Sequence, residues 1–591
     1  MVKRFHNIFK SANVYLQRRL SQRQFFILSS IIVGLSSGLA AILLKYLVHT
    51  IESSIEAYGE NHHSFSAVAW FPFLGLLLTT LFVYFVLKGN FKKGSAEIAY
   101  TIAKKSSVIP RSQTYTHFIT SALTVGFGGS TGLESPMVST GSAIGSNYGR
   151  IYNLTYKERT IMLACGAAAG ISAAFNSPIA GVLFAVEVLL TDISSAAFIP
   201  LIISSACGAL LSKIILEEGV IISFSLQQPF DYKNVPFYVI LGILAGLVSL
   251  YYARVFTWIE KSVKRIASPW LRVTFGGLFL LGLLIAFPPL FGEGYKTITE
   301  LAKLKPESLI TASALSGYLH SDAALLLFLT ALMLLKVVAA AVTIGSGGNG
   351  GSFGPSLFTG AYLGFVFARL VNLSGIAVIP EVNFTLVGMA GLLSGVLYAP
   401  LTGIFLIAEI TGGYALMIPL MIVAAISITV AHFFEPLSME ARKLSALLKQ
   451  PVDDRDKFLL SKLNLRELIE DAFSIVKPTD TLDILVKTIA VSRRNLFPVV
   501  NDAQELVGVI HLDNVRNVIF NPELYATLKV SDMMKPPAAV ISTQDHLHDI
   551  LKKFDETNEW NLPVTDGKIY KGFVSKSSIL AQYRKELLMS V

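Results

Sequence analysis

Cysteine and charge are both scarce in this chain. Only 15% of its 591 residues are Asp, Glu, Lys or Arg, whereas 53% are hydrophobic. Soluble domains carry about 25% charged residues, so the composition excludes an ordinary soluble protein and indicates a membrane protein. The two cysteines, Cys165 and Cys207, lie in apolar runs. Two such residues cannot form a disulfide framework, and we interpret both as small buried residues.

The few charges are unevenly distributed along the chain. From Pro451 onward there are 18 Lys and Arg and 20 Asp and Glu in 141 residues, whereas the first 450 residues hold 31 and 20. We therefore predict an N-terminal segment (1–24), a membrane region (25–450) and a soluble region (451–591). Six basic residues and no acidic residue precede the first apolar run: Lys3, Arg4, Lys10, Arg18, Arg19 and Arg23. This asymmetry predicts a cytoplasmic N-terminus rather than a nucleic-acid-binding protein, and the run is too long for a signal peptide.

A glycine-rich loop interrupts the membrane region between Gly126 and Pro136, and it contains one carboxylate, Glu134. Backbone that is not helical survives at membrane depth only where it is buried in protein or lines a cavity, and an ionisable side chain there is expected to be functional. Pro136 suits the first turn of a helix. The loop therefore directs helix-start N–H groups toward one point, where they attract anions. The alternative is a glycine-rich turn with a solvated glutamate.

The same pattern occurs a second time in the membrane region. The segment 345–355 aligns without gaps with the first loop, 219 residues earlier, and Phe353 takes the place of Glu134. A following block, 170–187, matches 392–409 after 222 residues. Two blocks in the same order indicate that the membrane region contains two copies of one unit. Broken helices at corresponding places mark a transport site near the membrane midplane.

Other apolar runs predict further membrane helices, several of them too short to cross a bilayer. They lie at 25–48, 69–87, 94–104, 161–175, 178–190, 198–215, 237–258, 273–290, 323–344, 355–371, 386–409 and 415–432. We therefore expect broken and tilted helices rather than a simple up-and-down bundle. Where small residues are dense, we expect these helices to approach one another closely.

The soluble region alternates between helical and strand patterns. Helical patterns at 482–491 and 547–555 each precede a pair of short predicted strands. This arrangement predicts a tandem pair of small α/β modules, which span 463–522 and 528–587.

These motifs resemble those of the CLC family of chloride channels and proton/chloride exchangers, and the C-terminal modules resemble a CBS (cystathionine-β-synthase-type) pair. The segment Gly132-Leu-Glu-Ser-Pro136 is similar to the family's Gly-Arg/Lys-Glu-Gly-Pro segment, and Gly351-Ser-Phe-Gly-Pro355 is similar to its Gly-x-Phe-x-Pro segment. The resemblance implies an α-helical polytopic membrane fold of two inverted repeats. It also implies a homodimer with one anion pathway per subunit.

The resemblance further implies roles for single residues. Glu134 would be the gating glutamate, which occupies an anion site when ionised and leaves it when protonated. Backbone N–H groups at Ser352 and Phe353, together with Gly132 and Leu133, would hold the anion. Amide donors suit a weakly basic halide, which must both enter and leave. No His or Cys cluster accompanies the loop, which disfavours a metal site.

Several positions depart from the family pattern. Leu133 and Ser135 replace a basic residue and a glycine beside the gate. In the segment Lys92–Glu97, the family's anion-binding serine falls on Lys93, or on Ser95 after a shift of register. The simpler interpretation of Lys93 is a solvated lysine.

Other departures concern the inner side of the pathway. The family's inner-gate tyrosine falls at Ser438 or Glu440, which leaves the inner gate unassigned. The internal proton-transfer glutamate is replaced by Val188. Glu187 remains beside it, and its match to Glu409 favours a structural role at a helix end over proton transfer.

The CBS pair also departs from its relatives. Positions where related modules carry a nucleotide-binding aspartate are occupied by Asn514 and Ser578, and Asp513 is one residue away. An adenine nucleotide is therefore left open as a ligand. A cytoplasmic domain that stabilises a dimer is the simpler interpretation.

The sequence thus predicts chloride transport across the plasma (inner) membrane through a glutamate-gated pathway, and no enzymatic activity. Channel-like conduction is favoured because Val188 cannot carry a proton, and a coupled proton/chloride exchanger is the alternative. A third interpretation is a CBS-based ligand sensor anchored by a degenerate membrane domain. The expected partners are chloride, membrane lipid and a second copy of the chain, with the N-terminal segment and the CBS pair in the cytoplasm.

Overall fold

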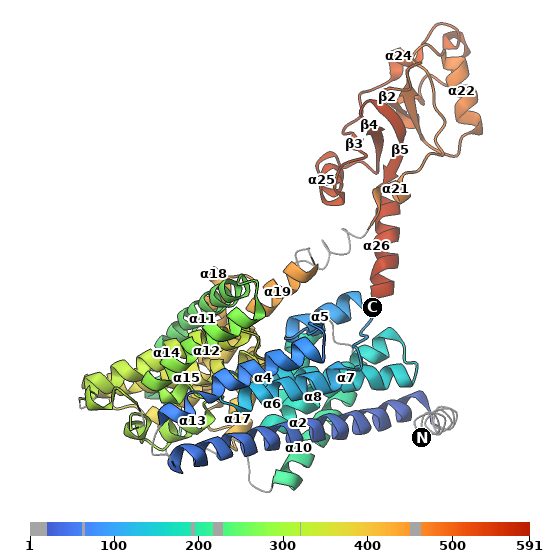
Figure 1. Ribbon diagram of the computed structural model, residues 1–591. Coiled ribbons are helices and arrows are strands. Elements are labelled where there is room, and N and C mark those ends of the chain that lie inside the picture. The colour runs from blue at the N-terminus through green and yellow to red at the C-terminus, as the bar shows by residue number, and fades with distance from the viewer. Residues whose placement is uncertain are drawn as a thin grey trace, which may run out of the picture. The chain divides into compact units, whose positions relative to one another are not determined.

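The computed structural model of the protein describes residues 20–61, 65–190, 195–216, 229–311, 313–318, 321–448 and 463–590. Most of the predicted N-terminal segment, up to residue 19, and the first part of the soluble region, 451–462, lie outside these residues. The chain divides into two compact units, Met1–Leu448 and Lys449–Val591 (Figure 1). Each unit is described by itself.

Helices build the first half of the membrane unit. They are α2 (Gln22–Asn61), α3 (Phe65–Val68), α4 (Phe71–Phe85), α5 (Ser95–Lys104), α6 (Gln113–Gly126), α7 (Glu134–Ile151), α8 (Tyr156–Phe175), α9 (Pro178–Phe184), the π-helical turn η1 (Ala185–Leu189) and α10 (Ser195–Leu216). The N–H of Gly129 bonds to the carbonyl of Thr124 at the end of α6, and α7 begins five residues later. The first glycine-rich loop therefore joins the end of one helix to the start of the next.

The second half continues with helices of the same kind. They are η2 (Tyr232–Asn234), α11 (Val235–Lys264), α12 (Pro269–Ala286), η3 (Pro288–Leu290), α13 (Tyr295–Ala302), η4 (Pro306–Leu309), η5 (Ser316–Tyr318), α14 (Asp322–Gly345), α15 (Phe353–Leu373), α16 (Glu381–Leu397), α17 (Pro400–Ile410), α18 (Met417–Phe434) and α19 (Met439–Leu448). Among the described residues, seven helices are long and apolar enough to cross a membrane, and several others are shorter apolar helices. The predicted fold of broken and tilted membrane helices is confirmed.

One predicted helix is wrong. The sequence predicts a single run over 386–409, but α16 ends at Leu397 and α17 begins at Pro400. Tyr398 has a φ of 59°, in the left-handed region that ends helices, and a proline cannot donate the N–H that would continue α16. Asn176, with a φ of 55°, ends α8 at the equivalent place in the first half. The two halves therefore break their helices at matching positions.

Close helix packing also repeats in the two halves. The glycines Gly141 on α7 and Gly166 on α8 touch through their backbones, so that a Cβ on either one would collide with the carbonyl of the other. Their equivalents, Gly360 on α15 and Gly388 on α16, meet in the same way. Small residues are what allow membrane helices to approach to this distance.

A local two-fold relation connects the halves at the two glycine-rich loops. The N–H of Gly132 donates to the carbonyl of Gly351 at 3.2 Å, and the N–H of Gly351 donates back to Gly132 at 2.9 Å. The two residues occupy the same position of the repeat and pair in antiparallel fashion. A mutual pair of equivalent residues is the geometry expected where an inverted repeat meets its copy.

Two carboxylates confirm this relation elsewhere in the unit. Glu187, at the end of the first-half block, accepts from the N–H groups of Leu401 (3.0 Å) and Thr402 (2.8 Å) at the start of α17. Its equivalent, Glu409, accepts from Ile179 and Ala180 at the start of α9, both at 3.0 Å. Each half therefore caps a helix of the other half.

The second unit has two small sheets. Its elements are α21 (Leu465–Leu468), α22 (Leu482–Val491), β1 (Leu496–Val500), β2 (Leu506–His511), α23 (Leu512–Val515), η6 (Pro522–Leu524), α24 (Val530–Met533), β3 (Ile541–Ser542), α25 (Leu547–Thr557), β4 (Asn561–Asp566), β5 (Ile569–Ser575) and α26 (Lys576–Ser590). One sheet pairs β1 with β2, and the other has the order β3-β4-β5. The predicted helix–strand–strand pattern of both modules is confirmed. The modules join where Phe473 and Phe573 pack against each other, with ring centroids 4.6 Å apart.

Candidate functional site

Two helix starts meet at the pair of glycine-rich loops. Helix α7 begins at Glu134 and α15 begins at Phe353, and neither the residue before α7 (Leu133) nor the residue before α15 (Ser352) caps its helix with a side chain. The first N–H groups of a helix have no partner within the helix and carry partial positive charge. The bridge between Gly132 and Gly351 holds both starts at one point. This point is therefore suited to an anion.

The carboxylate of Glu134 lies at this point and is 2% exposed. Its Oε2 accepts from the N–H of Gly354, in the first turn of α15, at 3.3 Å. Its Oε1 accepts from the hydroxyl of Tyr295, the first residue of α13. A carboxylate on the start of α7 thus binds the start of α15, where an anion would otherwise bind.

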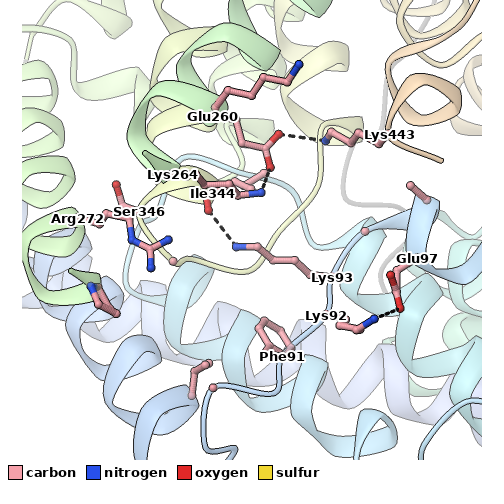
Figure 2. A pocket seen from close by; sticks show the side chains of 18 of the residues that line it. Phe91, Lys92, Lys93, Glu97, Glu260, Lys264, Arg272, Ile344, Ser346 and Lys443 are labelled. Carbon is pink, nitrogen blue, oxygen red and sulfur yellow. Dashed lines mark hydrogen bonds and ion pairs between the residues drawn. The ribbon is translucent and has the colours of Figure 1, made fainter. Parts of the chain in front are cut away.

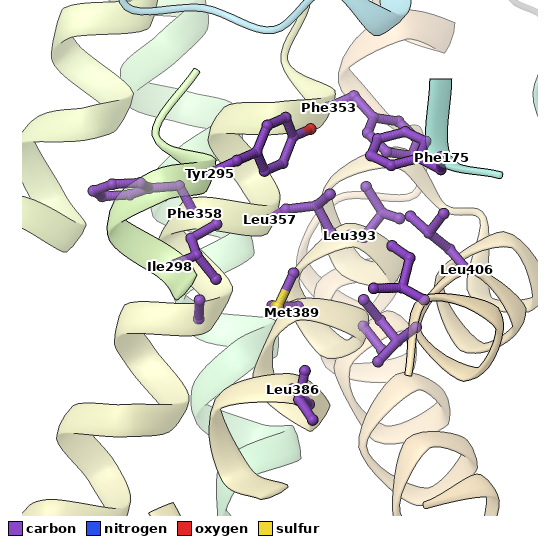
Figure 3. Packing of buried hydrophobic residues seen from close by; sticks show 14 of the residues in the cluster. Phe175, Tyr295, Ile298, Phe353, Leu357, Phe358, Leu386, Met389, Leu393 and Leu406 are labelled. Carbon is purple, nitrogen blue, oxygen red and sulfur yellow. The ribbon is translucent and has the colours of Figure 1, made fainter. Parts of the chain in front are cut away.

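Apolar side chains pack around Tyr295, which bonds to this carboxylate, and around Phe353, the first residue of α15 (Figure 3). The ring of Phe175 lies 5.5 Å from that of Phe353 and 6.1 Å from that of Tyr295, and Phe184 lies 6.2 Å from Phe353. Electrostatic interactions are stronger in such surroundings than in water. Whether a carboxylate or a small anion binds at this point therefore depends on a few donors, which include the N–H of Gly354 and the hydroxyl of Tyr295.

The other predicted anion-site donors in the first loop are already engaged. The N–H of Gly132 takes part in the bridge to Gly351. The N–H of Leu133 donates to Oε1 of Glu293 at 2.9 Å. Sequence reasoning missed Glu293, which lies in the connection between η3 and α13. The available signal was its position between two glycines, Gly292 and Gly294.

A cavity with a volume of about 710 Å³ lies beside the second glycine loop, where Gly345, Ser346 and Gly347 line it (Figure 2). Its lining contains more cations than carboxylates. The cations are Lys92, Lys93, Lys261, Lys264, Arg272 and Lys443, and the carboxylates are Glu97, Glu260 and Glu440. We refer to this cavity as the basic pocket. An excess of positive charge in a recess raises the local concentration of anions.

Lys93 is not the solvated lysine that the sequence favours. Its Nζ donates to the carbonyls of Ile344 (2.9 Å) and Gly348 (2.5 Å), and Figure 2 shows it turned toward the end of α14. Free carbonyls at a helix end attract cations. The side chain is therefore fixed beside the second glycine loop, at the wall of the basic pocket.

The surroundings of Lys93 change its acid–base behaviour. Burial lowers the pKa of this lysine to about 7, and the charges of Lys264, Lys443 and Arg272 act in the same direction, while Glu260 opposes them. Lys93 lies between α4 and α5, outside the helices that are long enough to span a membrane. The positive charge of the basic pocket consequently depends on pH near neutrality.

The remaining predicted inner-side residues lie at helix starts, and Ser438 and Glu440 accept backbone N–H groups there. Ser95 is the first residue of α5. The next N–H, of Ala96, donates to Oε2 of Glu440 at 3.1 Å. Ser438 accepts from the N–H of Ala441 at the start of α19, at 3.2 Å. These contacts place Ser438 and Glu440 at helix starts beside the basic pocket.

A tyrosine that the sequence did not single out lies close to the anion point. Tyr252, on α11, is fully buried, and its hydroxyl donates to the carbonyl of Ser352 at 3.1 Å. It lies within electrostatic range of both Glu134 and Glu440. Tyr252 therefore connects α11 to the residue before α15.

Val188 and Glu187 lie in the π-helical turn η1. Val188 packs against the apolar core. Glu187 caps α17, and its Oε2 also accepts from the hydroxyl of Thr402 at 2.6 Å. Glu187 therefore lies at a helix start, the position that the structural interpretation of this residue predicts.

The candidate nucleotide residues of the second unit make local contacts. Asp513, in α23, pairs with an arginine one turn along at 2.8 Å. Asn514 accepts from Lys535 at 3.3 Å. Ser578, near the start of α26, donates its N–H to the hydroxyl of Ser575 at 3.0 Å. These contacts compete with any ligand at the same groups.

Inverted repeats whose broken helices start at one buried, anion-suited point define a membrane transport protein. The family model "Voltage gated chloride channel" matches residues 75–432, and the CBS domain model matches 465–521 and 530–585. The chain belongs to the voltage-gated chloride channel family and carries a C-terminal CBS pair.

Individual proteins agree with this assignment. The chain is 31% identical over 386 residues to a ClcB-like chloride channel protein of Ralstonia nicotianae. The matched segment covers 63% of this chain and 84% of the relative. The fold is similar to that of a slow cyanobacterial Cl⁻/H⁺ antiporter (TM-score 0.62, 22% identity, 73% of this chain and 99% of that chain). It is also similar to a eukaryotic CLC transporter (TM-score 0.59, 19% identity, 94% and 97%).

Proposed function

We propose that this protein conducts chloride across a membrane through a pathway that Glu134 gates. One observation carries the proposal. The carboxylate of Glu134 accepts the N–H of Gly354 and thereby occupies the start of α15, where the helix-start donors suit a halide. When the carboxylate is protonated, its hold on this donor weakens and an anion can take its place.

Channel-like conduction is the mode that the residues support best. Coupled exchange needs a titratable path between Glu134 and the far side. The inner glutamate position holds the apolar Val188, and the neighbouring Glu187 is committed to the start of α17. Coupled proton/chloride exchange is the alternative mode, and a CBS-based sensor with a non-conducting membrane unit is the alternative class.

The proposal also covers the orientation of the chain in the membrane and its oligomeric state. The basic residues of the N-terminal segment support a cytoplasmic N-terminus, and the resemblance to the family implies that the CBS pair lies in the cytoplasm as well. The proposal also includes a homodimer with one pathway in each subunit, located in the plasma (inner) membrane, as the resemblance to the family implies.

A paired flux measurement tests the proposal. The full chain is reconstituted in liposomes with a chloride gradient and no pH gradient, and chloride and proton movements are recorded together. A channel passes chloride and drives no proton uphill, an exchanger drives protons in fixed proportion, and a sensor passes nothing.

Glu134→Gln is the matching variant. The neutral amide binds the N–H of Gly354 less strongly than a carboxylate, so chloride flux at neutral pH should rise about tenfold, the equivalent of about 1.4 kcal/mol. The pH dependence should become flatter at the same time. Wild-type flux and an unchanged pH response in this variant would remove Glu134 from the gating role.

A further inference from the structure

The connection from η3 to α13 is held firmly against the first glycine loop. The N–H of Gly292 donates to the carbonyl of Gly128 at 3.0 Å, and Nζ of the buried Lys336 donates to the carbonyl of Gly292 at 2.8 Å. Gly292 and Gly294 both have left-handed backbone, with φ of 58° and 92°, which favours glycine on either side of Glu293. These features fix the position of the residue between them.

Glu293 binds the start of α7 as Glu134 binds the start of α15. Its Oε1 accepts the N–H of Leu133, the residue before α7, at 2.9 Å. Glu134 accepts the N–H of Gly354 in the first turn of α15. Both helix starts that suit an anion therefore have a backbone donor bound to a carboxylate of the protein.

Glu293 also lies between solvent and the buried gate. It lines a pocket of about 500 Å³ whose other lining residues include Lys45, Glu52 and His49, but not Glu134. The pocket is bordered by the ion pair of Lys296 and Glu56, whose side chains are 60% and 44% exposed. An anion or a proton that enters this pocket therefore meets Glu293 beside the start of α7.

Several charged groups face Glu293. The carboxylates are Glu134 and Glu52, the cations are Lys45 and Lys336, and Tyr295 is also within electrostatic range. The two carboxylates that bind the helix starts are close enough to repel each other. Two such groups take up their protons as a coupled pair rather than independently.

We propose that Glu293 is a second gating carboxylate, which occupies the amide of Leu133 and must be protonated or displaced before an anion reaches the start of α7. This inference rests on the proposed anion pathway. Opening then requires two protonation events, one at each helix start, and chloride conduction responds to pH more steeply than a single carboxylate allows.

The test compares four variants of the full chain with the wild type in liposomes, with chloride flux recorded across a series of pH values. Glu293→Gln and Glu134→Gln each remove one charge with little change of shape, and the double variant removes both. Glu56→Gln is the control, because it neutralises a carboxylate at the rim of the same pocket. With the pH varied only on the side of the Glu293 pocket and held constant on the side of the basic pocket, we expect the dependence of flux on proton concentration to fall from about second order to about first order in each single variant, and to vanish in the double variant. The Glu56→Gln variant should follow the wild type.

Calorimetry provides a second measurement that does not depend on transport. Glu293→Ala frees the N–H of Leu133, so the purified variant should bind chloride about tenfold more tightly than the wild type. Wild-type flux and wild-type pH dependence in Glu293→Gln, with unchanged chloride binding in Glu293→Ala, would overturn the inference while leaving the gating role of Glu134 intact. A residue that only caps α7 would instead lower the melting temperature of Glu293→Ala without moving the pH profile. Absence of chloride flux in the wild type would contradict the proposed function, and the binding comparison would still decide the role of Glu293.

Discussion

Single side chains distinguish the two glycine-rich loops from each other. Equivalent positions of the repeat carry Glu134 in the first loop and Phe353 in the second, and this difference gives the site its buried carboxylate. Lys93 has a comparable influence on the other side of the loops. It is the cation of the basic pocket that is bonded to the second glycine loop, through the carbonyl of Gly348.

Lys93 should make anion entry from the basic pocket sensitive to pH. Its pKa is lowered to about 7, first by burial, so the ammonium is charged below that pH and neutral above it. Chloride flux should therefore fall when the pH on the pocket side is raised from about 6 to about 8, one unit on either side of that pKa. Lys93→Met should remove this component of the pH dependence.

The neighbouring lysine provides the control for this experiment. The side chain of Lys92 is 55% exposed and forms an ion pair with Glu97 at 3.0 Å. Lys92→Met should retain the wild-type response. An equal loss of the pH response in both variants would mean that the summed charge of the pocket, and not Lys93, is responsible.

At the scale of helices, the reciprocal caps join the two halves of the membrane unit. Glu187 and Glu409 are each worth about 1–2 kcal/mol as anionic caps at partly buried helix starts. Replacing either by glutamine should lower the melting temperature of the purified protein in detergent. The loss should be larger for Glu187, because it also binds the hydroxyl of Thr402.

The same variants separate a structural role from proton transfer. If Glu187 only caps α17, Glu187→Gln leaves the ratio of proton to chloride movement unchanged. A changed ratio with an unchanged melting temperature would assign Glu187 to a proton path instead.

The glycines at which two helices touch should not tolerate replacement by a residue with a side chain. Gly141→Ala places a methyl group against the carbonyl of Gly166, and Gly360→Ala does the same against Gly388. Overpacking of this kind costs about 1–3 kcal/mol and sometimes more. Both variants should show reduced yield of monodisperse protein and a lower melting temperature.

Gly282 is the matched control for these glycines. It lies within α12, and a Cβ there would meet nothing within 4 Å. Gly282→Ala should be neutral or stabilising by up to about 1 kcal/mol, since alanine favours a helix more than glycine does. A destabilised Gly282→Ala would show that helix propensity in the membrane, rather than close contact, sets the requirement for glycine.

The sequence alone was sufficient to predict those parts of the candidate site that occur in both copies of the repeat. The alignment of the two loops already indicated that the starts of α7 and α15 belong together, because matching glycines, a shared proline and a single carboxylate are local signals. It was not sufficient for Glu293 and Tyr252. These residues come from a connecting segment and from α11, and their approach to the loops depends on tertiary contacts such as that of Gly292 with Gly128, which leave no periodic pattern. The break at Pro400 did have a local signal, and the apolar run around it concealed that signal.

At the scale of the whole molecule, the chain joins a helical membrane unit to a CBS pair. Asn514 and Ser578 are engaged by Lys535 and Ser575 within the second unit, so an adenine nucleotide would have to displace these contacts. We expect ATP or AMP added to the purified full-length protein to leave both its melting temperature and its chloride flux unchanged. A rise in melting temperature with nucleotide concentration, abolished by Asp513→Ala, would contradict this expectation and establish a regulatory ligand.

The mutual pairing of Gly132 with Gly351 has an electrical consequence. In two inverted copies the equivalent helices run in opposite directions, so the repeat itself favours neither face of the membrane. A preference for one direction of ion movement can arise only where the two copies differ, above all at Glu134 and Phe353. If the proposed chloride pathway conducts, any rectification of its current would therefore arise from side chains that differ between the copies, and substitution would alter it while the helices stay in place.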